Sequence, residues 1–100
     1  MIVVSGIMTF EPSSHDRVVE LARTLTTESL KEASCRTYGL WADLDVRGQF
    51  RIFEEWESQE GLAEHFATPH FAAFGEGLAE GALVRMDVHR YIEPEVADLF

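Results

Sequence analysis

Three titratable side chains in the segment Phe50–Phe74 can carry acid–base chemistry: Glu54, His65 and His70. A histidine is neutral near pH 7 and can accept a phenolic proton, and a carboxylate held away from water can fix the tautomer of a histidine. We therefore identify these three as candidate catalytic residues. Each histidine is equally well interpreted as a packing or capping residue beside Pro69, and Glu54 alternatively hydrogen-bonds backbone donors only.

Aromatic side chains near these residues suit a flat ligand. Tyr38 and Trp41 flank Gly39 in a predicted strand, where a glycine often marks the close approach of a ligand or of another backbone. The aromatic residues further along the chain suit a hydrophobic core as well as a ligand, and the core is favoured for most of them. The candidate substrate-binding residues are Tyr38, Trp41, Trp56, Phe66 and Phe74.

Neither a metal site nor a nucleotide site is predicted. His65 and His70 are separated by five positions across a proline, with Glu64 adjacent, and this matches no common metal-ligand spacing. The glycine-rich stretch Gly75–Gly81 follows a predicted helix, so it cannot hold a phosphate at a helix start as a dinucleotide fingerprint does. We expect no metal and no cofactor.

The elements that must position these residues follow from apolar periodicity and from turn residues. Phe50, Ile52, Glu54 and Trp56 alternate along one side of a strand, which predicts a carboxylate in an otherwise apolar row. The predicted elements are a strand at 1–10, a helix opened by Pro12 with a Ser13–Asp16 capping box, a strand from about Cys35 to Leu44, a hairpin turn at 45–48, a strand from Phe50, helices at 58–66 (capped by Ser58) and at 69 to about 78 (capped by Thr68), and a strand at 83–92.

This β-α-β-β-α-α-β order predicts one domain, residues 1–100, with the α+β ferredoxin-like sandwich fold. Apolar side chains on both faces of the strands leave apolar area exposed once helices cover one face. We therefore expect a homodimer whose two sheets pack face to face. The tail at about 94–100 either contacts the partner subunit or frays. The apolar residues that lead to this expectation are Val3, Ile7, Tyr38, Leu40 and Phe53.

The composition of the chain also disfavours several classes of binding partner and location. The chain has a formal net charge of −10, which disfavours nucleic acids and anionic membrane surfaces as partners. Cys35 is the single cysteine and excludes an intrachain disulfide. No apolar run reaches the roughly 20 residues of a membrane span, and no basic signal segment opens the chain. A cytoplasmic location is expected.

The order E-x-W-E-S-x-E-x-L-x-x-H-F-x-T-P-H-F-x-x-F, which begins at Glu54, resembles the antibiotic biosynthesis monooxygenase family. The resemblance extends over nearly the whole chain. It implies a dimeric α+β barrel and a cofactor-independent monooxygenase that acts on a small electron-rich aromatic, either a quinol or a polyketide-like compound. Two alternatives stay open: a non-catalytic dimeric module that binds small molecules or regulates a partner, and a cyclase or isomerase on the same fold.

One departure from the family pattern affects the expected reaction. Relatives that oxidise anthrones or degrade haem use an asparagine in the pocket, and this chain contains no asparagine. The haem-degrading relatives also use a tryptophan and an iron-ligating histidine. The positions that match these three residues are Gly6, His65 and roughly Gly75. We therefore expect that the protein does not degrade haem.

Overall fold

The computed structural model describes residues 1–100 and confirms the predicted α+β order, with one additional 3₁₀ turn before the first helix. Each element lies within a few residues of its predicted range. The elements are β1 (Ile2–Phe10), the 3₁₀ turn η1 (Pro12–Ser14), α1 (His15–Ser29), β2 (Cys35–Ala42), β3 (Gln49–Trp56), α2 (Gln59–Phe66), α3 (Pro69–Gly77) and β4 (Leu83–Ile92).

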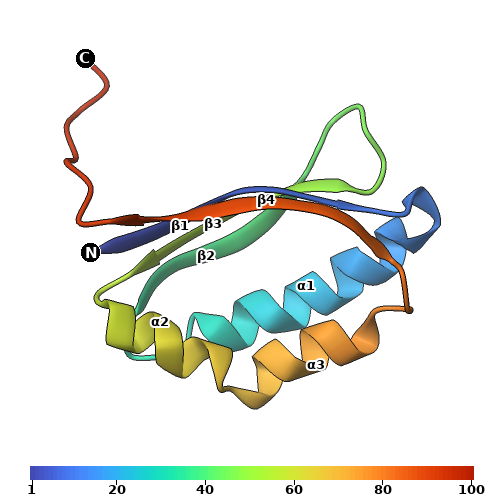
Figure 1. Cartoon of the computed structure of the whole chain (residues 1–100), viewed down its shortest axis with the longest axis horizontal. Coiled ribbons are helices and arrows are strands. Elements are labelled where there is room, and N and C mark those ends of the chain that lie inside the picture. The colour runs from blue at the N-terminus through green and yellow to red at the C-terminus, as the bar shows by residue number, and fades with distance from the viewer.

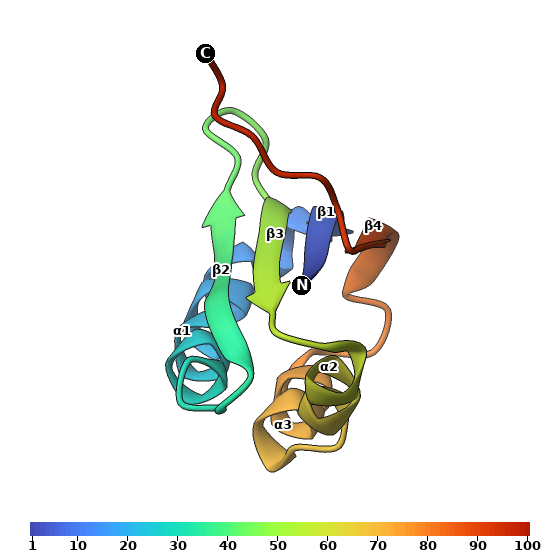
Figure 2. The ribbon, with the colours of Figure 1, turned by 90° about the vertical axis from the view of Figure 1, so that its left-hand side faces the viewer.

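The four strands form one antiparallel sheet in the order β2-β3-β1-β4, which is the ferredoxin-like arrangement. All three helices lie on the same side of this sheet, and the other side is open (Figures 1 and 2). At the centre of the sheet, Gly6 of β1 pairs with Ile52 of β3 on one side and with Val88 of β4 on the other. Strands β2 and β4 are therefore the two free edges.

The two short helices begin where capping chemistry predicts. The Ser58 hydroxyl accepts a hydrogen bond from the Gly61 amide at 3.0 Å, and the Thr68 hydroxyl accepts one from the Phe71 amide at 3.2 Å. Pro69 occupies the first turn of α3, where a missing N–H costs nothing. The break between α2 and α3 is thus fixed by local sequence, and it sets the positions of the histidines on either side of it.

Two predicted boundaries are wrong. The helix cap is Ser14 rather than Ser13, and it forms no side-chain capping bond, because Pro12 starts a 3₁₀ turn first. Strand β2 ends at Ala42 rather than Leu44. The Asp43 carboxylate accepts hydrogen bonds from the Asp45 and Val46 amides, both at 2.9 Å, and this turn ends the strand early.

The helix-covered face of the sheet carries the core. The alternation predicted for β3 is confirmed, because Phe50, Ile52, Glu54 and Trp56 are all buried on this side. The buried residues form two clusters, one at each end of the sheet: Ile2, Leu25, Tyr38, Trp56 and Leu62 make one, and Met8, Phe10, Val18, Phe50 and Ile52 make the other.

The open face is partly apolar, as expected. Tyr38 and Leu40 face the helices, so the apolar residues left on the open face are Val3, Ile7, Trp41, Phe53 and Tyr91. The chain after β4 runs away from the helices, and its side chains Leu99 and Phe100 are exposed (Figure 1). None of the helices has the length and hydropathy needed to span a membrane.

Candidate active site

A cavity of about 380 Å³ lies between the sheet and the helices α2 and α3. This volume is in the range that holds a small-molecule ligand. Its wall is largely apolar, and a few polar side chains reach it. We call it the aromatic cavity; its aromatic and charged lining residues include Tyr38, Glu54, Phe66, Phe71, Phe74 and Arg90.

Glu54 is the buried carboxylate on the wall of this cavity. Its side chain comes from the middle of β3 and is only 4% exposed. One oxygen, Oε1, accepts a hydrogen bond from Trp56 Nε1 at 2.8 Å. Burial raises the pKa of Glu54 to about 7, although the indole hydrogen bond acts in the opposite direction. Near neutral pH this side chain is therefore poised between acid and base.

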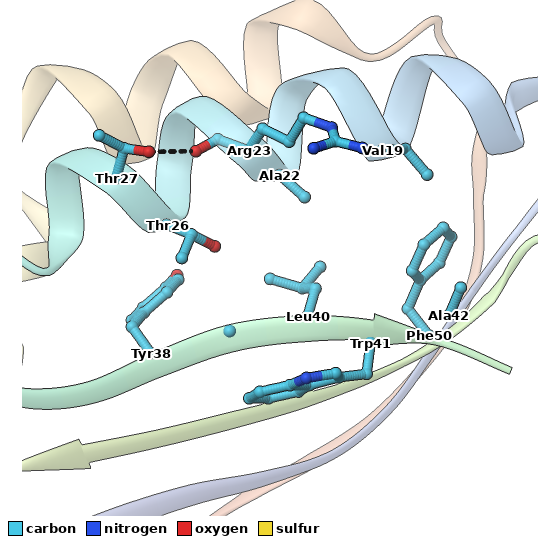
Figure 3. Close-up of a pocket in the computed structure, with 11 residues that line it drawn as sticks. Val19, Ala22, Arg23, Thr26, Thr27, Tyr38, Leu40, Trp41, Ala42 and Phe50 are labelled. Atoms are coloured by element: carbon cyan, nitrogen blue, oxygen red, sulfur yellow. Dashed lines mark hydrogen bonds between the residues drawn. The ribbon is translucent and has the colours of Figure 1, made fainter.

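Three further titratable residues line the same cavity, namely Tyr38, Arg90 and His89, and the His89 side chain is paired with Asp87. Burial and the neighbouring Glu54 carboxylate raise the pKa of the Tyr38 phenol well above its ordinary value, so Tyr38 stays protonated and can donate a hydrogen bond. Arg90, on the edge strand β4, lies over the Phe66 ring at 5.9 Å from its centroid. The Tyr38 hydroxyl is directed toward α1 and Ser29, so a ligand anion in this cavity would meet the Arg90 guanidinium (Figure 3).

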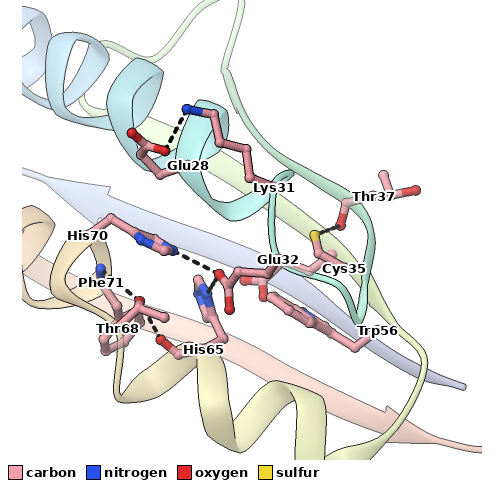
Figure 4. Close-up of polar contacts among 11 residues, drawn as sticks. Glu28, Lys31, Glu32, Cys35, Thr37, Trp56, His65, Thr68, His70 and Phe71 are labelled. Atoms are coloured by element: carbon pink, nitrogen blue, oxygen red, sulfur yellow. Dashed lines mark hydrogen bonds and ion pairs between the residues drawn. The ribbon is translucent and has the colours of Figure 1, made fainter.

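The two candidate histidines lie beside the cavity rather than on its wall. His65 Nδ1 and His70 Nε2 both contact one oxygen of Glu32, Oε2, at 2.6 and 2.8 Å (Figure 4). Glu32 lies in the loop that joins α1 to β2. Burial lowers the pKa of His65, and the Glu32 carboxylate partly offsets this. His65 is 0% exposed and packs against the Trp56 ring.

The hypothesis that Glu54 fixes the tautomer of a histidine is therefore corrected. The carboxylate that contacts both histidines is Glu32, and the side chain that contacts Glu54 is Trp56. Sequence reasoning missed Glu32 because it lies 33 positions before His65, in a loop with no periodic pattern. The only local signal was a single acidic residue just beyond the end of a predicted helix.

The candidate substrate-binding residues occupy three different places in the structure. Tyr38, Phe66 and Phe74 line the aromatic cavity. Trp56 is fully buried behind it and acts as the hydrogen-bond donor to Glu54. Trp41 points to the open face of the sheet, where its ring covers Gly39. The close approach that we inferred at Gly39 is thus made by the Trp41 ring of the same chain.

A second, more open hollow of about 560 Å³ lies between α1 and the edge strand β2, and we call it the helix–edge groove. Figure 3 shows Tyr38 and Leu40 pointing toward α1, with Trp41 on the far side of the strand. Its polar lining comes from Arg23, Thr26 and Thr27, and it contains no carboxylate or histidine. The aromatic cavity is therefore the better candidate for acid–base chemistry.

The family model described as antibiotic biosynthesis monooxygenase matches residues 1–77 of the chain. The chain belongs to this family. Within the family domain the match includes β1 to α3, and so it contains Glu54, both histidines and Glu32. A comparison with curated protein sequences gives no significant match.

Solved structures support the same family. A crystal structure of an antibiotic biosynthesis monooxygenase is 29% identical, with a TM-score of 0.80 over 97% of this chain and 100% of that chain. A conserved protein of unknown function from Bacteroides thetaiotaomicron, described as a possible oxidoreductase, is 30% identical, with a TM-score of 0.78 over 90% of this chain and 94% of that chain. A conserved protein from Methanosarcina mazei is 26% identical, with a TM-score of 0.79 over 90% and 89% of the two chains.

Proposed function

We propose that this family member is a cofactor-independent monooxygenase that oxidises a small electron-rich aromatic, such as a quinol, in the aromatic cavity. The observation that carries the proposal is Glu54, a buried carboxylate with a pKa of about 7 on the wall of a cavity of about 380 Å³ lined by phenyl rings. Family membership supports monooxygenase chemistry, and the cavity wall supports a flat apolar substrate.

In the proposed reaction, the ionised Glu54 carboxylate removes a phenolic proton from the substrate. The resulting phenolate is electron-rich enough to reduce oxygen, and a base of matched pKa makes this proton transfer efficient near neutral pH. One oxygen atom enters the ring of the substrate and the other leaves as water. The substrate itself supplies every electron for this reduction, so no external reductant is needed.

The remaining polar groups of the cavity have separate tasks in this proposal. The Arg90 guanidinium holds the negative charge that develops on the substrate oxygen, and the Tyr38 ring forms part of the wall. Phe66 and Phe71, which line the cavity and pack on each other at 5.2 Å between ring centroids, are themselves partly exposed and narrow the access of water to the reacting atoms. His65 and His70, paired with Glu32, support the cavity from behind.

The test measures oxygen uptake with a quinol panel, corrected for the spontaneous oxidation of each quinol. We expect Glu54→Gln to lower turnover by about 10²–10⁴-fold, because the amide cannot accept the proton. Glu55→Gln is the matched control, since Glu55 is the next residue of β3, faces the other side of the sheet and bonds Thr37 at 2.6 Å. This control should keep the parent rate.

Other results would overturn the proposal in distinct ways. If Glu54→Gln keeps the parent rate and His70→Ala loses it, the base is in the histidine pair. Product formation under nitrogen would identify a cyclase or isomerase. Tight binding of a quinol with no turnover under air would identify a binding module. Labelled oxygen gas supplies the positive marker, because one labelled atom must appear in the product.

A further inference from the structure

The contacts of Glu32, His65 and His70 form a cluster that takes no part in the proposed proton transfer. Their three ligand-type atoms come from the α1–β2 loop, the last turn of α2 and the first turn of α3, and all lie within 4.8 Å of one another. The side chains are 15%, 1% and 17% exposed, so the cluster is sheltered but reachable from solvent (Figure 4).

We propose that Glu32, His65 and His70 form a binding site for a divalent transition-metal ion, with Zn²⁺ as the best match. Two imidazoles and one carboxylate are a common donor set for such ions, and three protein ligands leave a position open for water. The site goes beyond the proposed oxidation and shares no residue with the wall of the aromatic cavity.

The geometry of the hydrogen bonds supports a shared cation. Both histidine nitrogens point at the same carboxylate oxygen, Glu32 Oε2, although the second oxygen of Glu32 forms no hydrogen bond to either ring. Ligand atoms of a tetrahedral zinc site lie roughly 3.3 Å apart, given metal–nitrogen distances of about 2.0–2.1 Å. Side-chain movements on the order of 1 Å therefore turn this hydrogen-bonded trio into a coordination shell.

A second observation points to an unfilled polar site in the same region. The structure has three buried side-chain atoms without a hydrogen-bond partner, and they are Ser29 Oγ, Ser34 Oγ and His65 Nε2. The two serine hydroxyls lie elsewhere, because Ser29 Oγ lies near the Tyr38 phenol and Ser34 Oγ lies beside Gly61 at the start of α2. Of the three atoms, only His65 Nε2 belongs to the cluster. An unpaired buried polar atom is rare in folded proteins, so this one indicates a missing partner such as a bound water.

Metal binding requires both imidazoles to change tautomer, because His65 Nδ1 and His70 Nε2 each donate a proton to the Glu32 carboxylate in the hydrogen-bonded cluster. His70 must coordinate through Nε2, so its remaining proton moves to Nδ1. His65 must coordinate through Nδ1, so its remaining proton moves to Nε2 and becomes a buried donor. Ordered water that accompanies the ion can accept from this donor. The unfavourable term for one buried N–H is small beside the free energy of several metal–ligand bonds. The charge of −10 also attracts cations to the molecule.

The test titrates the purified, chelator-treated protein with Zn²⁺ by calorimetry and with Co²⁺ by visible absorption. We expect one ion per chain, an absorption spectrum typical of nitrogen and oxygen ligation at low coordination number, and a higher melting temperature with Zn²⁺. His70→Ala and Glu32→Ala should each weaken binding by at least about tenfold, because even indirect partners of metal ligands contribute that much.

His89→Ala is the matched control. His89 also pairs with a carboxylate, Asp87, at 2.9 Å, but this pair is exposed and has no third ligand, so its removal should leave the affinity unchanged. His70→Ala keeps the buried His65 in place, and circular dichroism checks that it folds. The proposal is wrong if neither ion binds in a one-to-one ratio, or if binding survives in both cluster variants.

Discussion

Glu54 and Glu55 are neighbouring glutamates of β3 that lie on opposite faces of the sheet, and the two faces give them different environments. Glu54 points toward the helices, where burial raises its pKa to about 7. Glu55 points to the open face and bonds Thr37 across the strands at 2.6 Å. The layer of helices, rather than the residue type, therefore turns a strand carboxylate into a candidate catalytic base.

A substitution on the open face of the sheet should have the largest effect, because this face is the predicted dimer interface. Phe53 lies between Gly39 and Ser5 in the sheet and is the bulky apolar residue at its centre. If the predicted dimer packs through this face, Phe53→Glu places an unpaired charge in the interface, at a cost of several kcal/mol. We expect the parent protein to show twice the chain mass by light scattering at micromolar concentration and the variant to show one chain mass.

Phe53→Leu serves as the control for this prediction, because it keeps the position apolar and should keep the dimer. If the parent protein is monomeric at micromolar concentration, dimer formation does not explain why the open face is apolar. The same measurement also tests the tail, since deletion of residues 94–100 should weaken the dimer only if the tail reaches the partner subunit.

The pH dependence of folding stability should distinguish the carboxylates of Glu54 and Glu55. Because the pKa of folded Glu54 is about 7 and the ordinary value for a glutamate is 4.5, the folded protein holds a proton that the unfolded chain has already released between these values. The contribution of Glu54 to stability is therefore full below about pH 4.5, and it is lost, by about 3 kcal/mol in total, as the pH rises from there through 7. Glu54→Gln should flatten this dependence in urea unfolding, whereas Glu55→Gln should leave it in place.

Substitutions of two glycines, one on each face of the sheet, should give the smallest losses of stability. A methyl group at Gly6, on the helix-covered face, would collide with the backbone of Asp87 and Val88 in the neighbouring strand. A methyl group at Gly39, on the open face, would meet the Trp41 ring, which is exposed and can rotate away. We expect Gly6→Ala to cost about 1–3 kcal/mol and Gly39→Ala less than about 1 kcal/mol.

Urea unfolding of both glycine variants measures this difference. Equal losses of unfolding free energy in the two variants would show that the Trp41 ring moves aside no more easily than the backbone beside Gly6. A loss at Gly39 that depends on protein concentration would instead show that the ring is fixed by a partner subunit.

Sequence reasoning succeeded where the information is local. Period-two alternation placed Glu54 inside, and the Ser58 and Thr68 caps located the break between α2 and α3. It failed where the determinant is distant. The contact between Glu32 and His65 joins segments 33 positions apart, and no pattern within either segment indicates the other. The strand β2 was ambiguous for another reason, because Tyr38 and Trp41 are apolar residues on opposite faces.

The two tryptophans give the molecule one intrinsic fluorophore for each face of its sheet. Trp56 is fully buried, and its indole N–H is bound to the Glu54 carboxylate, whereas Trp41 is 53% exposed on the open side. Their emission maxima and their access to a dissolved quencher should therefore differ strongly. In a Trp41→Phe background the remaining signal reports the charge of Glu54 and the contents of the aromatic cavity, and in a Trp56→Phe background it reports whether the open face is covered.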